Sequence, residues 1–246
     1  MVEYNMATEE DHEEIYQLLR TVFNRPEEFL NRHRLAMGDP YYKPEQRHIV
    51  RVDGKIMGHV YTPHRVTRIG VARVDIGGIM WVGTDPGQWR KGYGRQLMKE
   101  VIDYLKNQGC VASPLTATLF DFYRPLGYEA YHDEVRTKIS TLSLPKENDI
   151  GFSVKEYTPS DLPGLMSIYD EFYRTWTCTI CRPQEYWNSY GADYNGAEHQ
   201  SRRRGLSFAI QDVGNFSVGM FIKQTVDAVY ESFACFVQLP YQHRCR

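Results

Sequence analysis

The chain lacks any run of about 18 or more consecutive apolar residues, the length that a membrane-spanning helix requires. Its polar, acidic beginning also lacks the basic start and the apolar core of a secretory signal. The formal net charge is only −2, so the chain has no general electrostatic attraction to nucleic acid or to an anionic membrane. These absences predict a soluble cytoplasmic protein whose partners include neither nucleic acid nor a membrane.

Cysteine is scarce as well. The five cysteines are an odd number in a chain of 246 residues, which argues against a disulfide framework. Cys178 and Cys181 have the spacing of metal ligands, but no second pair of cysteines or histidines follows at the distance that a zinc site needs. The eight histidines show no such spacing either. We therefore expect free thiols and no bound metal.

Two common phosphate-binding patterns are also missing. The Walker pattern needs Gly-Lys-Ser/Thr, and the dinucleotide pattern needs three spaced glycines. Instead, an apolar segment at residues 79–82 has the length of a buried strand and ends in the turn-forming residues 83–87. Residues 88–95 then lead into residues 96–106, whose apolar positions recur at the spacing of a helix. The order is therefore strand, loop and helix.

The loop has the chemistry of an anion site. Gly92 and Gly94 let the backbone come close to a ligand where the helix begins. The unpaired N–H groups of the first helical turn lie at the positive end of the helix dipole, and Arg90, Lys91 and Arg95 add positive charge at the same place. This segment predicts a binding site for a pyrophosphate at the end of the strand.

This arrangement resembles motif A of the GCN5-related N-acetyltransferases (GNATs), in which basic residues and a Gly-x-Gly turn hold the pyrophosphate of acetyl-coenzyme A. After a strand at residues 111–117, residues 118–128 are similar to the helix and the Phe-Tyr-x-x-x-Gly-Tyr/Phe ending of that family. Trp89 departs from the Gln or Arg that the family usually carries three residues before the first glycine. The resemblance implies an α+β fold with a mixed, mostly antiparallel sheet and flanking helices.

The resemblance also implies roles for individual residues. Tyr123 lies where the family places a phenol near the coenzyme sulfur, and it is the expected general acid, with a packing role as the alternative. Asp75, one strand from the thioester position, is the candidate general base, with an outward-facing strand residue as the alternative. The expected contacts to acetyl-coenzyme A are Val82, Gly83, Thr84, Arg90, Lys91, Gly92, Tyr93, Gly94, Arg95, Thr118 and Leu119.

The preceding residues predict the rest of a first domain. Residues 2–6 indicate a strand and residues 8–23 a capped helix, and a shorter helical segment is expected at residues 26–39. An Asp-Gly turn between alternating runs at residues 48–52 and 55–61 predicts a hairpin.

Two features of this first domain bear on the reaction. Gly77 and Gly78, at the end of a strand, indicate a bulge or a close backbone approach. In the family such a bulge separates two strands and leaves N–H groups for the thioester. Glu27, Glu28 and Asp39 fall in the expected acceptor wall and could attract a cationic amine, although a solvated helix face is the ordinary role of such charges.

A polar linker at residues 145–149 divides the chain into a first domain, residues 1–144, and a second, residues 145–246. The second repeats the strand, cap, helix and hairpin order of the first, but it contains no basic Gly-x-Gly turn. We expect an incomplete GNAT-like unit that does not bind coenzyme A by itself. Its truncated sheet would leave an exposed edge at residues 228–236, and exposed edges favour pairing with another chain, so a homo-oligomer is expected.

Tandem GNAT units with one cofactor motif resemble the enhanced intracellular survival (Eis) family of aminoglycoside acetyltransferases. Members of that family continue into a domain similar to sterol carrier proteins, whose terminal carboxylate enters the active site, and this sequence has no counterpart of that domain. The resemblance implies acetyl transfer from acetyl-coenzyme A to a primary amine of a small polyamine or aminoglycoside-like acceptor. Two alternatives stay open: a non-catalytic acyl-coenzyme A-binding or interaction module, and acetylation of a protein lysine or N-terminus.

Overall fold

The computed structural model describes residues 1–25, 30, 36–117, 119–132, 154–155, 158–174, 176, 179–188, 209–210 and 233–238. They fall into two compact units, which are described one at a time. The first comprises Met1–Thr67, Ala72–Asp133 and Glu231–Arg246, and the second comprises Arg68–Val71 and Glu134–Tyr230. In this grouping the end of the chain belongs with the first unit, whereas the linker predicts one boundary near residue 144.

The first unit contains four antiparallel strands in the order β1 (Val2–Met6), β2 (Arg47–Val52), β3 (Lys55–Tyr61) and β6 (Met80–Thr84). The hairpin predicted from the Asp-Gly turn is confirmed, because β2 and β3 pair across it. Both turn residues have a positive φ, 50° and 84°, as the tightest hairpin turn requires.

A second group of strands continues the unit. β4 (His64–Ile69), which the sequence pattern does not separate from its neighbours, lies beside β5 (Ala72–Gly77). On its other side β5 runs parallel to β7 (Ala112–Ala117), with Ile76 opposite Ala112. Parallel neighbours within an otherwise antiparallel arrangement make the strands mixed, as the GNAT resemblance implies.

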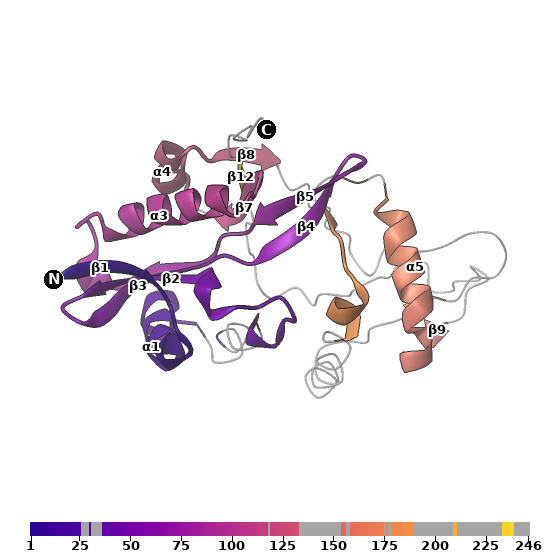
Figure 1. Ribbon diagram of the computed structural model, residues 1–246, viewed down its shortest axis with the longest axis horizontal. Coiled ribbons are helices and arrows are strands. Elements are labelled where there is room, and N and C mark those ends of the chain that lie inside the picture. The colour runs from indigo at the N-terminus through magenta and orange to yellow at the C-terminus, as the bar shows by residue number, and fades with distance from the viewer. Residues whose placement is uncertain are drawn as a thin grey trace, which may run out of the picture. The chain divides into compact units, whose positions relative to one another are not determined.

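The strand nearest the end of the chain completes this group. β12 (Phe233–Gln238) lies between β7 and β8 (Glu129–His132) and is antiparallel to both, and Figure 1 shows the three strands together. The exposed edge predicted at residues 228–236 is therefore wrong for its described residues, 233–236, because this strand pairs on both sides. The argument for a homo-oligomer depended on that edge and is lost with it.

Two amphipathic helices cover opposite faces of β1 to β3 (Figure 1). α1 (His12–Phe23) packs its buried side chains with Ile49, and α3 (Tyr93–Asn107) packs its own with Val50. Successive residues of a strand point to opposite faces, so these two neighbours in β2 belong to separate cores. The buried residues of α3 are Leu97, Met98, Val101, Ile102 and Leu105, as its helical spacing predicts.

The second unit begins with the same local structure as the first. The backbone N–H of Thr158 donates to Asp161 Oδ2 over 2.9 Å, and that of Thr8 donates to Asp11 Oδ2 over 2.9 Å. A helix follows each cap, which is α5 (Leu162–Phe172) in the second unit. The predicted repeat of cap and helix is thus present in the described residues.

The remaining described parts of this unit are short. β9 (Val154–Lys155) pairs antiparallel with β11 (Ala209–Ile210), and Tyr169 of α5 donates through Oη to the carbonyl oxygen of Ile180, in β10 (Thr179–Ile180), over 2.8 Å. The predicted linker and most of the predicted second hairpin lie outside the described residues. None of the described helices combines the length and the apolar character that crossing a membrane requires.

Candidate active site

The central feature of the first unit is a β-bulge in β6. Gly83 lies opposite His59 and Met80 lies opposite Tyr61, so Trp81 and Val82 together face a single residue of β3. Trp81 has a φ of 53°, in the left-handed region that a bulky side chain rarely adopts. A bulge was among the two predictions for Gly77 and Gly78, but the register shift lies at Trp81 instead.

Gly77 satisfies the other alternative, the close backbone approach. A Cβ atom at Gly77 would lie 2.2 Å from Cδ2 of Leu105, so α3 packs directly on the backbone at the end of β5. Gly78 donates its N–H to the carbonyl oxygen of Pro63 over 2.9 Å.

Two strands separate beyond this point. Ile79 forms a parallel bridge with Leu115 of β7, but the following residues of β6 pair with β3, in a sheet that does not include β7. The strands therefore diverge after the bridge. Val82, Gly83 and Thr84, the expected thioester and pantetheine contacts, lie in the diverging part of β6.

The basic loop, residues 85–92, connects the end of β6 to the start of α3. Asp85 accepts the N–H of Gly87 over 2.8 Å, and the indole N–H of Trp89 donates to the carbonyl oxygen of Thr84 over 2.8 Å. Arg90 then has a φ of 62° and Gly92 a φ of 87°. These contacts fold the loop back on β6, so α3 begins beside the end of that strand.

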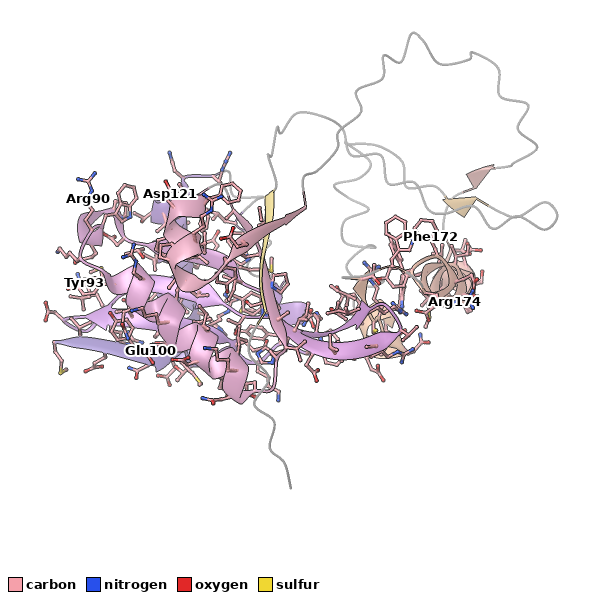
Figure 2. All side chains as sticks on the ribbon, turned by 90° about the horizontal axis from the view of Figure 1, so that it is seen from above. Arg90, Tyr93, Glu100, Asp121, Phe172 and Arg174 are labelled. Atoms are coloured by element: carbon pink, nitrogen blue, oxygen red, sulfur yellow. The ribbon has the colours of Figure 1, made fainter. Side chains whose placement is uncertain are left out.

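The first turn of α3 has the properties expected of an anion site. Gly92 is its N-cap, and a glycine offers no side chain to cap the N–H groups of this turn. Its N–H groups, at the positive end of the helix dipole, are therefore suited to a phosphate. Arg90, Lys91 and Arg95 are exposed around it, and Figure 2 shows Arg90 and Tyr93 at this end of α3, with Glu100 farther along the helix.

Gly94 sets the distance between this turn and the strand. A Cβ atom at Gly94 would lie 2.8 Å from Thr84 Oγ1 and 3.8 Å from Cζ of Phe122. The helix start, the end of β6 and α4 (Phe120–Tyr123) therefore meet at this glycine. The N–H groups of the first turn and the three cationic side chains are donors that fit the pyrophosphate of coenzyme A. The close approach of Gly94 to Thr84 holds these donors beside the end of β6.

Tyr123 lies in the core beneath these elements. It is 8% exposed, and it belongs to the same cluster as Val82, Tyr93 and Ala117. Its ring contacts those of Phe122 and Tyr128 edge to face, with centroids 4.9 and 5.8 Å away. The fold thus brings Tyr123 together with the predicted coenzyme residues of β6 and α3. Of the last two predicted contacts, Leu119 is exposed at the start of α4, and Thr118 lies outside the described residues.

Asp75 is not part of this group. It is exposed on β5, before the point where the strands diverge, and its carbonyl oxygen accepts the N–H of Val111 over 2.9 Å. Burial raises the pKa of the Cys110 thiol to about 11, and the negative charge of Asp75 makes a smaller contribution in the same direction. The hydrogen bond with Val111 places Asp75 beside that residue, just before β7 begins, whereas Tyr123 follows the end of β7.

The expected acceptor wall is only partly described. Glu27 and Glu28 lie outside the described residues. Asp39 forms a salt bridge with Arg65 in which both side chains are largely buried, so its charge is already matched within the chain. Among the residues that the structure describes, no three His, Cys, Asp or Glu side chains gather as metal ligands would.

Sequence reasoning missed a buried polar group beside the bulge. Arg47 and His59 are fully buried, with 0% exposure each. Arg47 Nη1 lies 3.3 Å from His59 Nε2, and His59 Nδ1 lies 2.9 Å from the carbonyl oxygen of Trp81. Both residues occupy strands whose other buried positions are mostly apolar, and alternation would assign such polar residues to the solvent face.

A family model for the acetyltransferase (GNAT) domain matches residues 3–131. No protein of curated function matches the chain. Solved structures with a similar fold include a GCN5-related N-acetyltransferase from Anabaena variabilis, with 15% identity, a TM-score of 0.66, and coverage of 98% of this chain and 59% of that one. A probable N-acyltransferase from Enterococcus faecalis has 19% identity and a TM-score of 0.62, over 77% of this chain and 48% of that one.

Eis1 from Mycobacterium abscessus is also similar, with 15% identity and a TM-score of 0.57, over 86% of this chain and 51% of that one. The chain thus spans about half the length of the solved structures that it matches. At these identities the likeness concerns the fold. Because the family model covers more than half of the 246 residues, and the divergent strands, the bulge and the basic helix start all lie within it, the chain belongs to the GNAT acetyltransferase family.

Proposed function

We propose that the chain transfers an acetyl group from acetyl-coenzyme A to a primary amine of a small polyamine or aminoglycoside-like acceptor. The observation that carries the proposal is the uncapped first turn of α3, surrounded by Arg90, Lys91 and Arg95 and placed beside the bulged end of β6. In this proposal the basic loop holds the pyrophosphate and Val82 to Thr84 line the thioester.

The reaction requires a neutral amine, a polarised carbonyl and an acid for the departing thiolate. The amine nitrogen attacks the thioester carbon, so that a C–N bond forms and the C–S bond breaks. The departing thiolate takes the proton of the Tyr123 hydroxyl, since a phenol is ordinarily protonated at neutral pH. The attacking nitrogen, positively charged once the C–N bond has formed, loses its extra proton to a base or to water, and the phenolate of Tyr123 regains a proton from solvent. Its position in the cluster with Val82 and Tyr93 supports this role. Asp75, which is exposed on β5, stays a candidate for the base, with an outward-facing strand residue as the alternative.

The choice of acceptor follows the Eis-like resemblance and the similarity in fold to Eis1. A polyamine or an aminoglycoside is a polycation, so acceptor binding should weaken as the salt concentration rises, because salt screens charge attraction. A panel of amines at two salt concentrations, assayed by release of free thiol from acetyl-coenzyme A, identifies the acceptor class.

Titration calorimetry with acetyl-coenzyme A tests the cofactor site. Removing both charges in Arg90→Ala/Lys91→Ala should weaken binding about tenfold or more, since charge-assisted contacts to phosphate are among the strong ones. Lys55→Ala/Arg73→Ala is the matched control, because it removes two exposed charges from β3 and β5. Equal binding by both variants would contradict the site. Binding without thiol release from any amine would instead favour a non-catalytic acyl-coenzyme A-binding module.

A further inference from the structure

The conformation of Trp81 needs an explanation. Its φ of 53° places a bulky residue in the left-handed region, which is strained for any side chain with a Cβ atom. Such conformations persist only where neighbouring groups enforce them, and they gather at functional sites. Trp81 lies within β6 directly before Val82, Gly83 and Thr84, the proposed thioester contacts.

Three contacts hold this residue. The Trp81 ring meets the ring of Phe23 in α1 edge to face, with centroids 5.5 Å apart and planes at 87°. Within the sheet, Met80 pairs with Tyr61 before the bulge and Gly83 pairs with His59 after it, so the strand is held on both sides of Trp81. The third contact is the one between His59 Nδ1 and the Trp81 carbonyl oxygen, at 2.9 Å. This hydrogen bond acts on the backbone at the strained position itself.

The hydrogen bonds around His59 have a definite direction. Arg47 Nη1 lies 3.3 Å from His59 Nε2, and a guanidinium group can only donate. Nε2 must therefore accept, which makes His59 a neutral imidazole with its hydrogen on Nδ1. That hydrogen points at the Trp81 carbonyl oxygen, which can only accept.

Arg47 is itself fixed in place. Its guanidinium lies over the rings of Tyr61 and Tyr42, at 4.7 and 5.3 Å from their centroids. Arg47 Nε donates to the Tyr42 hydroxyl oxygen over 2.9 Å, and that hydroxyl lies 2.6 Å from His12 Nε2. The aromatic rings and the hydrogen bond determine where the guanidinium lies, and the guanidinium in turn determines which nitrogen of His59 carries the hydrogen.

We propose that His59 is a positioning residue for the acetyl-transfer site: its Nδ1–H holds the Trp81 carbonyl and thereby keeps the bulge that sets the register of Val82, Gly83 and Thr84 against α3. This inference rests on the proposed function. Without the donor, the Trp81 carbonyl oxygen loses this part-buried hydrogen bond, and such a loss costs free energy. Relaxation of the bulge would shift the following residues by one position, and a shift of one residue turns each side chain to the other face.

Three variants separate the donor from the packing. In His59→Gln the amide reaches the position of Nε2 and keeps a partner for Arg47, but no donor remains near Nδ1. In His59→Asn the amide nitrogen takes the place of Nδ1 and can donate to Trp81. His48→Gln is the matched control, because His48 is another buried histidine of the same sheet, 5% exposed, and its Nε2 lies 3.3 Å from Thr62 Oγ1 rather than near β6.

For each variant, the change in kcat is compared with the change in affinity for coenzyme A. His59→Gln should lower kcat by up to about 100-fold, since misplacement of reacting groups by about 1 Å has effects of that size. Its affinity for coenzyme A should change far less, by about twofold or below 0.5 kcal/mol, because the charged contacts to the pyrophosphate come from the basic loop. His59→Asn should recover most of kcat, and His48→Gln should leave it unchanged. An equal loss of kcat and coenzyme A affinity, or wild-type kcat in His59→Gln, overturns the proposal.

Two further measurements do not depend on activity. Nitrogen-15 spectra of the wild-type imidazole groups should show His59 neutral with its hydrogen on Nδ1, and a hydrogen on Nε2 alone or an imidazolium overturns the proposal. In a crystal structure of His59→Gln, Trp81 should leave the positive-φ region, and an unchanged bulge also overturns it. If the wild type neither binds acetyl-coenzyme A nor releases thiol, the proposed function fails, while these two measurements still decide whether His59 holds the bulge.

Discussion

Two glycines at the start of α3 are needed for different physical reasons. At Gly94 space is limiting, because a Cβ atom would lie 2.8 Å from Thr84 Oγ1. At Gly92 a Cβ atom would meet nothing within 4 Å, but φ is +87°, a conformation that costs other residues about 1–2 kcal/mol. One glycine therefore sets the distance between helix and strand, and the other allows the chain to turn into the helix.

This difference predicts distinct effects for two substitutions. Gly94→Ala should push α3 away from β6, lowering acetyl-coenzyme A affinity about tenfold and the free energy of unfolding by about 1–3 kcal/mol. Gly92→Ala should lower the free energy of unfolding by about 1–2 kcal/mol through backbone strain. Calorimetry and urea denaturation measure both quantities.

Gly164→Ala in α5 is the control for these substitutions. A Cβ atom at Gly164 would meet nothing within 4 Å, and its φ lies outside the left-handed region. This variant should be neutral or stabilising by up to about 1 kcal/mol. Unchanged acetyl-coenzyme A affinity in Gly94→Ala would show that the close approach of α3 to Thr84 is unnecessary for the site.

The pKa of His48 makes stability depend on pH. Burial, with a smaller contribution from His64, lowers this pKa from 6.5 to about 4. Between these values the unfolded chain binds a proton that the folded chain does not, so stability is complete above pH 6.5 and is lost as the pH falls toward 4. The loss amounts to as much as about 3 kcal/mol. Urea denaturation at pH 7, 5.5 and 4.5 should show this slope, and His48→Gln should flatten it; an equally steep slope in that variant would assign the effect to other groups.

At the scale of elements, local patterns explain what could be predicted from the sequence. The Asp53-Gly54 turn determines its hairpin because both residues accept a positive φ, and the apolar spacing of α3 corresponds to the face that it buries. The loop between β6 and α3 is likewise local, since its glycines and cations are adjacent in sequence. These features lie within a few residues of one another, so no distant contact is needed to define them.

The bulge at Trp81, unlike these local features, depends on residues that are distant in the sequence. Trp81 is a residue of high strand preference, and its left-handed conformation depends on contacts with His59 and Phe23 from other elements. The sequence predicts a bulge at Gly77 and Gly78 because glycine is common at bulges. In the structure, Gly77 is instead needed for the close approach of the Leu105 side chain. The position of a bulge is decided by tertiary contacts, which a single sequence does not reveal.

At the scale of the whole molecule, the first unit depends on a strand from the far end of the chain. β12 pairs with β7 from Phe233 opposite Ala117 to Gln238 opposite Ala112, and it pairs with β8 on its other side. The sequence repeat predicts that residues 228–236 belong with a second domain. Repeats identify which segments are related, whereas strand pairing is decided by which sheet edges are available.

This arrangement predicts that residues 1–144 do not form a complete unit by themselves. Without β12, the facing edges of β7 and β8 would be left unpaired, and unpaired edges favour aggregation. A fragment of residues 1–144 should therefore aggregate or unfold without a cooperative transition, as followed by circular dichroism and sedimentation, and should bind acetyl-coenzyme A more weakly than the full chain.

Adding the missing strand back separates this explanation from a general effect of truncation. A peptide of residues 231–246 supplied to the fragment should restore cooperative unfolding and acetyl-coenzyme A binding, because the peptide provides the backbone partners of both edges, whereas a scrambled peptide of the same composition should not. A fragment that unfolds cooperatively and binds acetyl-coenzyme A as tightly as the full chain would show that β12 is dispensable and that the predicted boundary at residue 144 marks an independent domain. Restoration by the native peptide alone would mean that a GNAT unit of this chain requires β12, a strand that begins at Phe233, 101 residues after its neighbour β8 ends at His132.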